Sequence, residues 1–123
     1  MKNGLPAARR AEMHLRVGRV LEQVAPRPME IANELAWHYS HAATVGGAAD
    51  AVRWERVAAE KACRSFAYQD AVHHLRRALA SVRKVLRDDA LEHEVLSELA
   101  TAAHAAGDTH TASVAQQRIE SLR

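Results

Sequence analysis

The sequence has few of the residues that cross-link a chain or break its helices: one cysteine, three prolines and five glycines in 123 residues. A single cysteine cannot form an internal disulfide, and the apolar helical neighbours of Cys63 indicate a packed side chain rather than a reactive thiol. Long apolar runs are also missing, so the sequence predicts neither a signal peptide nor a membrane span. We therefore expect a cytoplasmic protein.

The motifs of common catalytic and nucleotide-binding sites are missing as well. The sequence has no Gly-rich loop that continues into Lys and Ser or Thr, the pattern that holds phosphates. It also has no Ser, His and Asp arrangement, no nucleophile elbow and no carboxylate pair at an inferable cleft. We therefore expect a protein that is not an enzyme and that uses no cofactor.

What the sequence does contain is typical of a helical protein. It is 48% hydrophobic, 4% aromatic and 26% charged, and alanine, leucine, arginine and glutamate dominate. Small side chains let two helix backbones approach closely, as stacked helical hairpins require. Such alanines recur at three, four and seven residues in the segment 35–79, namely Ala58, Ala59, Ala62, Ala71 and Ala78.

Prolines and glycines divide the first half into three expected helices. Pro26 and Pro28 end an amphipathic helix at 8–24, whose apolar side comprises Met13, Val17, Val20, Leu21 and Val24. A second helix at 29–43 presents Ile31, Leu35, Tyr39 and Ala42 on one face, with Ala32 and Ala36 beside them. Gly46 and Gly47 end the connection that follows. A third helix at 48–66, with Trp54 as an anchor between layers, turns inward Ala51, Val52, Ala58, Ala59 and Ala62.

Three more helices are expected in the second half. A fourth at 68–82 turns the segment 73–77, HHLRR, outward and buries Ala71, Val72, Leu75, Ala78, Leu79 and Val82. Asp89 and Glu92 predict a capping box for a fifth helix, which buries Leu91, Val95, Leu96, Leu99, Ala100 and Ala103. Gly107 ends it, and Asp108 or Thr109 caps a sixth helix at 110–122, which buries Ala112, Ala115, Ile119 and Leu122.

An internal repeat relates the two later hairpins. The set Ala59, Ala71 and Ala78 is spaced by 12 and 7 residues, and so is the set Ala100, Ala112 and Ile119, 41 residues further on. That separation exceeds the roughly 34 residues of a tetratricopeptide repeat. The surplus is about two helical turns, which we place near residues 84–92. Each hairpin alone leaves an apolar side bare, so we expect the hairpins to stack.

The last hairpin resembles a tetratricopeptide repeat. The small-residue frame of that repeat is matched by Leu99, Ala100, Ala103, the Gly107 and Asp108 turn, and Ala112. Gln116 stands where an aromatic or aliphatic residue is usual, as in a solvent-facing cap. The expected fold is all-α: one domain over residues 1–123, a tetratricopeptide-like right-handed superhelix of about six antiparallel helices. A leading helix covers 1–25, core hairpins cover 29–82, and a C-terminal hairpin covers 89–122.

A closer resemblance covers about residues 5–79. Its motifs are LP, two arginines, HL and LE within 5–22, ELAWHY at 34–39, and AYQDAVHHLRRAL at 67–79. They resemble the helical region that follows the ATPase module in large bacterial signal-transducing ATPases, including MalT-like and LuxR-type transcriptional activators and some multidomain cyclases and kinases. The resemblance implies a sensor or protein-interaction scaffold whose partners include ATPase or DNA-binding domains. The chain would be a fragment, a truncated reading frame or a stand-alone descendant of such a regulator.

Basic residues are concentrated before residue 88. Residues 1–87 hold 15 Lys and Arg against 8 Asp and Glu, whereas residues 88–123 hold 2 against 7. The alternative function is therefore a basic nucleic-acid-associated helical domain. Acidic residues alternate with the basic ones, however, and no helix-turn-helix or aromatic stacking platform is evident. The basic clusters are Arg9, Arg10, Arg16 and Arg19, and Arg76, Arg77, Arg83, Lys84 and Arg87.

Eight histidines raise the question of a metal site. Glu34, His38 and His41 share one helix face at one-turn intervals. The sequence has no HExxH motif, no cysteine pair and no Glu-x-x-His pattern, and the adjacent His73 and His74 point in different directions. We therefore expect no metal and interpret His38 as a packing or hydrogen-bonding residue.

The expected working surface is the concave side of the stack, where helical repeats hold a peptide, a helix or another domain. Aromatic and arginine side chains are frequent anchors for protein partners, although aromatic residues more often belong to the core. The exposed end helices of a short array also leave self-association open. The candidate partner-binding residues are Trp37, Tyr39, Trp54, Tyr68, Arg76 and Arg77.

Overall fold

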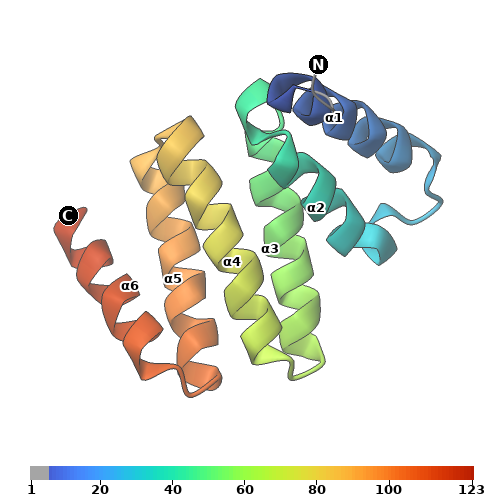
Figure 1. Ribbon diagram of the computed structural model, residues 1–123. Helices are drawn as coiled ribbons and strands as arrows, with labels where there is room; N and C mark the ends of the chain where they lie inside the picture. Colours follow the sequence, from blue (N-terminus) through green and yellow to red (C-terminus); the bar gives the residue numbers. More distant parts are fainter. Residues whose placement is uncertain (1–5) are drawn as a thin grey trace.

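The computed structural model describes residues 6–123, and every regular element in this part of the chain is helical (Figure 1). Two 3-10 turns, η1 (Pro28–Ile31) and η2 (Ala43–Val45), flank the second α-helix, and a π-helical turn, η3 (Val82–Leu86), extends the fourth. The six α-helices are α1 (Ala7–Val24), α2 (Ala32–His41), α3 (Ala48–Arg64), α4 (Tyr68–Ser81), α5 (Asp89–Ala105) and α6 (Thr109–Ser121). The prediction of an all-α fold with six helices is confirmed.

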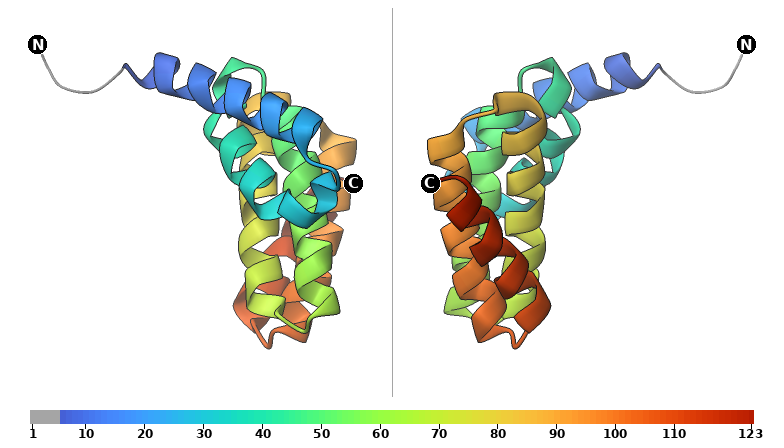
Figure 2. Two further views of the ribbon diagram at one scale, coloured as in Figure 1. Left: turned by 90° about the vertical axis from the view of Figure 1, so that its right-hand side faces the viewer. Right: turned by 90° about the vertical axis from the view of Figure 1, so that its left-hand side faces the viewer.

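The helices form a row of antiparallel hairpins. Helices α3 to α6 stand side by side with alternating direction, and α1 and α2 lie obliquely across one end of the row (Figures 1 and 2). Most contacts join helices that are consecutive in the sequence, as in a stacked helical array. None of the helices in the described part of the chain combines the length and the apolarity that a membrane span needs.

Aspartate side chains cap the two C-terminal helices. The Asp88 carboxylate accepts a hydrogen bond from the Leu91 backbone N–H at 3.0 Å, and the Asp108 carboxylate accepts one from the Thr111 N–H at 3.1 Å. The prediction of Asp108 as a cap is therefore confirmed. The predicted Asp89 capping box is wrong, because Asp89 is already the first helical residue and Asp88 takes the capping position.

The residues that lengthen the internal repeat lie at the end of α4. The π-helical turn η3 follows the regular helix, and Arg87 then adopts a left-handed conformation with φ 51°. The Arg87 N–H donates to the Val82 carbonyl at 2.6 Å and closes this wider turn. The extra length is thus absorbed by a π-helical turn and a short link rather than by regular α-helix.

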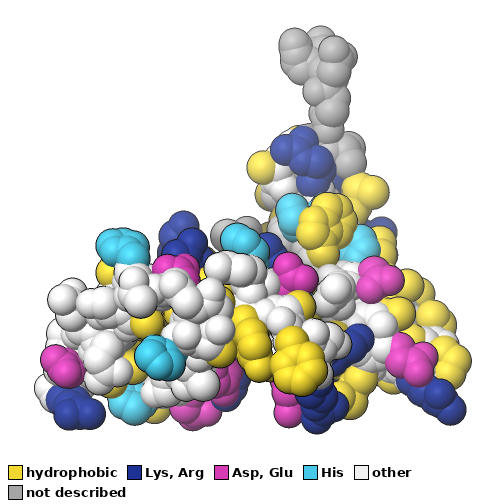
Figure 3. Space-filling model, turned by 90° about the horizontal axis from the view of Figure 1, so that it is seen from below, with side chains coloured by type: hydrophobic (Ala, Val, Ile, Leu, Met, Phe, Trp, Pro, Cys, Tyr) yellow, Lys and Arg dark blue, Asp and Glu magenta, His cyan; other side chains and the backbone are white. Residues whose placement is uncertain are grey.

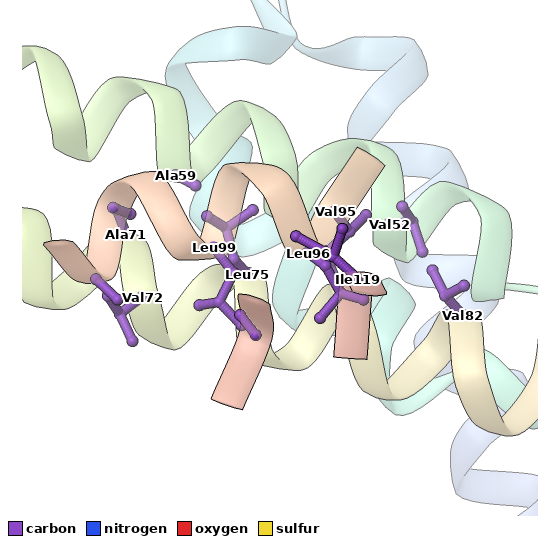
Figure 4. Close-up of a cluster of buried hydrophobic side chains, with 14 residues drawn as sticks. Val52, Ala59, Ala71, Val72, Leu75, Val82, Val95, Leu96, Leu99 and Ile119 are labelled. Carbon is purple, nitrogen blue, oxygen red and sulfur yellow. The ribbon is translucent and has the colours of Figure 1, made fainter. Parts of the chain in front are cut away.

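The hydrophobic core consists of two clusters, which meet at α3. The larger cluster joins α3, α4, α5 and α6 (Figure 4). The smaller cluster lies between α2 and α3, and Leu15 and Leu21 of α1 pack against it. Alanines occupy the closest helix contacts and are almost fully buried. The larger side chains of the first cluster are Val52, Val72, Leu75, Val82, Val95, Leu96, Leu99 and Ile119.

Helix α1 packs through a different face from the one that its apolar pattern predicts. Of the predicted set, only Leu21 packs against the core. The other four side chains face outward, with exposed fractions of 46% for Met13, 41% for Val17, 51% for Val20 and 67% for Val24.

Small residues explain the orientation of α1. The buried residues of this helix are Ala11 and Gly18. A Cβ at Gly18 would lie only 3.1 Å from the Tyr39 ring, so the absence of a side chain lets the two helices close on each other. The prediction assumed that the most hydrophobic face of α1 is buried. The buried face is instead the one with the smallest residues, because α1 can approach α2 most closely there.

Glu55 of α3 is a fully buried carboxylate that joins α2, α3 and α4. Its Oε2 accepts hydrogen bonds from Ser40 Oγ at 2.8 Å and from Arg77 Nε at 3.0 Å. Its Oε1 lies 2.7 Å from His74 Nδ1. A buried charge is tolerated only when such partners surround it, so this network fixes the relative positions of three helices.

Removing the Glu55 carboxylate is expected to destabilise the fold strongly. We expect Glu55→Ala to lower the free energy of unfolding by about 3 kcal/mol, because Ser40 and His74 lose their buried acceptor. Urea unfolding followed by circular dichroism measures this change. Glu60→Ala, on an exposed turn of the same helix, is the matched control and should change stability by less than about 0.5 kcal/mol. Equal effects of the two variants would contradict the role assigned to Glu55.

Candidate functional site

A groove of about 600 Å³ lies between α3 and α5, the first helices of two consecutive hairpins. Leu75 of α4 forms its floor together with Ala59 and Ala102, and these three side chains are at most 4% exposed. The volume falls within the range of natural ligand sites, and an apolar floor suits an apolar side chain. Its rim is formed by Arg56, Glu60, Cys63, Ser97, Glu98 and Thr101.

A charged clamp crosses the groove. Arg56 on α3 donates through Nε to Glu98 Oε1 on α5 at 3.0 Å and through Nη2 to the second Glu98 oxygen. It also reaches Glu94 Oε1 at 3.3 Å. These hydrogen bonds, with Glu98 the largest contributor, raise the pKa of Arg56 above its usual value. Arg56 therefore holds the two walls together and leaves a charged rim beside an apolar floor.

Cys63 lies on the α3 wall and is half-buried. Burial raises the pKa of its thiol, and the negative charge of Glu60 adds to this shift. The thiol is therefore protonated at neutral pH, which makes it a poor nucleophile. Its position makes Cys63 a chemical reporter of whether the groove is occupied.

Two of the predicted partner-binding residues belong to the core. Tyr39 is 1% exposed and Trp54 is 4% exposed, so neither is accessible to a partner in this structure. Both hold α1 in place through Glu22, whose Oε1 accepts a hydrogen bond from the Tyr39 hydroxyl at 2.7 Å and one from Trp54 Nε1 at 3.4 Å. The prediction of Trp54 as an anchor between layers agrees with this position.

Glu22 is the polar link between α1 and the two following helices. Besides Tyr39 and Trp54, it pairs with Arg53 Nη2 at 2.9 Å. Burial by itself would raise the pKa of Glu22, but the hydrogen bonds from Tyr39 and Arg53 outweigh it and hold the pKa below its usual value. Burial is the largest cause that raises the pKa of Tyr39, and the hydrogen bond of its hydroxyl to Glu22 adds to this shift. Glu22 therefore stays ionised and keeps α1 attached at neutral pH.

Trp37 remains exposed, at 52%, and stands in a cluster of histidines. Its ring centroid lies 5.0 Å from that of His14, 5.0 Å from His38 and 4.4 Å from His41. His14 of α1 and His38 of α2 meet through their Nδ1 atoms at 3.0 Å, so one imidazole must donate and the other accept. Within the described residues, no group of three His, Cys, Asp or Glu side chains is arranged to hold a metal ion.

Several arginines of the predicted basic surface are bound to the protein itself. Arg76 donates to the Thr111 hydroxyl on α6, and Arg77 donates to the buried Glu55. Arg83 pairs with Glu92 at 3.5 Å. Arg77 and Arg83 pair with carboxylates within the chain and have less charge to offer to phosphates, whereas Arg76 keeps its charge because its Thr111 acceptor is neutral. Internal pairing therefore weakens this basic surface in part.

An exposed aromatic pair at the α3–α4 turn includes a residue that the sequence analysis overlooked. Phe66 is 78% exposed and has a φ of 61°, a left-handed conformation that is unfavourable for a bulky side chain. Its ring packs at 6.3 Å against Tyr68, which is half-buried. Hydrophobic side chains are visible beside this turn (Figure 3). The sequence predicted only that the chain turns near Ala67, and an aromatic residue at the end of an expected helix was assigned to that helix.

Comparison with protein-family models, with curated proteins and with solved structures found no match to this chain. The resemblance to the helical region of bacterial ATPase regulators therefore stays a prediction. The groove, the exposed aromatic pair, Trp37 and the outward face of α1 are among the surface features available to a partner.

Replacing Phe66 by glycine is expected to give a more stable protein than replacing it by alanine. Glycine adopts a φ of 61° without a Cβ penalty. We therefore expect the free energy of unfolding of Phe66→Gly to exceed that of Phe66→Ala by about 1 kcal/mol. Both variants lose the ring contact with Tyr68, which makes the alanine variant the matched control. Thermal unfolding measures the difference, and a glycine variant less stable than the alanine variant would contradict strain at this turn.

Acid is expected to weaken the docking of α1 on α2. Burial is the main cause that lowers the pKa values of His14 and His38, and neighbouring positive charges add to it. Their folded pKa values lie below the unfolded value, so the folded state binds fewer protons and stability falls as pH drops below about 6.5.

Tryptophan fluorescence across this pH window, from Trp37 in the cluster and Trp54 at the attachment of α1, reports on this docking. His14→Gln should flatten the pH dependence, since it removes one of the two facing imidazoles. His110→Gln on α6 is the control and should retain the wild-type profile. Identical profiles for the wild type and His14→Gln would contradict the assignment.

Proposed function

We propose that the chain is a non-catalytic protein-interaction scaffold that binds a peptide segment of a partner protein in the groove between α3 and α5. The observation that carries this proposal is the combination of an apolar floor with a charged rim in one hollow of about 600 Å³. Both walls are helices of the rigid core, so the groove is formed before a partner arrives. Preformed sites of this kind lose less entropy on binding.

The floor and the rim divide the task of recognition. Leu75, Ala59 and Ala102 leave space for an apolar side chain of the partner. Arg56 and Glu98 place opposite charges at the edge, and each is 30–41% exposed at its side chain. A segment with one apolar anchor flanked by charged residues fits this pattern, because partial exposure lets the rim exchange its internal ion pair for contacts with the partner.

The rim hydroxyls supply directional contacts. Ser97 donates to the His93 carbonyl at 2.9 Å, and Thr101 donates to the Ser97 carbonyl at 3.0 Å. Each hydroxyl oxygen therefore keeps lone pairs that can accept from a partner's N–H. A peptide backbone laid along α5 would find these acceptors one helical turn apart.

The parent context we propose is a bacterial signalling or transcription regulator. The resembling motifs at 34–39 and 67–79 fall on α2 and α4, which build the core. This placement supports a scaffold role, since the matched residues hold the helices of the array together and do not form a reactive site. ATPase or DNA-binding domains are the proposed partners within such a regulator, and a neighbouring coding segment for either would support this assignment.

Selection from a displayed peptide library against the whole chain tests the groove. A selected peptide should bind Thr101→Trp at least about tenfold more weakly than the wild type, because the indole fills the groove. It should also slow alkylation of Cys63 by iodoacetamide.

The matched control is Gln116→Trp on the exposed side of α6, which should leave peptide affinity unchanged. Binding that is indifferent to Thr101→Trp, together with unprotected Cys63, would contradict the groove as the working surface.

A further inference from the structure

The outward face of α1 is an unpartnered stripe of apolar side chains, which we call the α1 stripe: Met13, Val17, Val20 and Val24. All four are more than two-fifths exposed. The opposite face of α1 packs on α2 through Ala11 and Gly18, so the stripe is not needed to hold the helix in place. In Figure 2 the N-terminal part of α1 extends beyond the row of helices.

The spacing of the stripe is that of a helix-pairing seam. Its members follow one another at intervals of four, three and four residues, the a and d pattern of a coiled coil. Three of the four are valines, and two of them, Val17 and Val24, fall at a positions, where β-branched residues favour paired helices. A stripe of a and d positions alone is narrower than the apolar face that a helix buries in a membrane surface. Helices of that kind are also rich in Trp, Phe and Leu, which the stripe lacks.

Arginines border the stripe. Arg9 and Arg16 are seven residues apart and lie along one edge, at positions that flank a seam in paired helices. Neither has an acidic partner within 4.0 Å among the described residues. Glu12 lies further round the helix, away from the stripe.

We propose that the α1 stripe binds an amphipathic α-helix of another protein whose apolar seam is bordered by Asp or Glu side chains. Charge complementarity selects this occupant, because acidic borders would neutralise Arg9 and Arg16. A second copy of the chain would instead bring the arginines of two α1 helices into one seam, where like charges repel. The stripe shares no residue with the groove between α3 and α5, so this binding stands independently of the proposed function.

Two synthetic peptides of about three heptads test the proposal with the full chain. Both have leucine at a and d, and one has glutamate and the other lysine at e and g. Fluorescence anisotropy of the labelled peptides should show binding of the glutamate peptide, weakened by salt, and no binding of the lysine peptide. Arg9→Glu with Arg16→Glu should reverse this preference, a result that a loss of folding cannot produce.

The double substitution Val17→Gln and Val20→Gln should weaken binding of the glutamate peptide at least about tenfold. Glutamine favours helix and both sites are exposed, so circular dichroism should show an intact fold. The control is Val114→Gln, at an apolar residue of α6 that is 50% exposed, and it should bind the peptide like the wild type.

Three results would overturn the proposal. The first is equal binding of the two peptides. The second is a dimer in sedimentation that the Val17 and Val20 substitutions dissociate, which would assign the stripe to a second copy. The third is binding to phosphatidylserine vesicles, in place of the peptide, that is lost in the same variant, which would assign it to a membrane.

Discussion

The close approach of neighbouring helices through alanine and glycine is the constraint on which the rest of the structure depends. Ala32, Ala51, Ala71 and Ala78 have no exposed surface, and each stands where two helices meet. Larger side chains there would separate the helices and open the spaces that Leu75 and Leu96 now fill. Helix spacing in turn determines the width of the groove between α3 and α5.

Hydrogen-bonded carboxylates select one arrangement of helices among those that alanine packing alone would allow. Glu55 connects α3 to α2 and α4, and Glu22 connects α1 to α2 and α3. Glu92 of α5, buried like Glu55, pairs with Arg118 of α6 at 2.8 Å. Hydrogen-bonded charges tolerate only one arrangement, so they specify which helices are neighbours and in which register. Hydrophobic burial supplies the stability and these carboxylates supply the specificity.

The sequence was sufficient to predict the helices and most of their buried faces, because the period of apolar residues is a local property. Most of the inward sets of α2 and α5 is confirmed, with Leu35, Tyr39, Val95 and Leu99 buried, whereas Ile31, Leu91 and Ala100 are partly buried. The α1 face was wrong, since a local pattern cannot distinguish a stripe that packs inside the chain from one that faces outward. Only the contact of Gly18 with Tyr39 decides between them.

The surface features were less accessible to sequence reasoning. Arg56 and Glu98 are 42 residues apart, so their ion pair across the groove exists only after α3 and α5 are placed side by side. Phe66 appeared to be part of a helix, because its left-handed backbone follows from the tight turn rather than from its own preference. The groove results from the spacing of α3 and α5, and alanines at its floor make it deep. The sequence predicted that alanines allow close helix packing but not that they would leave a groove.

Helix α3 is a wall shared by the two core clusters, with Val52 and Ala59 on one side and Ala51 and Ala58 on the other. The same helix forms one side of the groove and carries Arg53 and Trp54, whose N–H groups donate to Glu22 of α1. A small tilt of α3 would therefore be felt at both ends of the molecule. If an occupant of the groove changes the free energy with which α1 attaches to the core, the attachment of α1 must change the binding free energy of that occupant by the same amount.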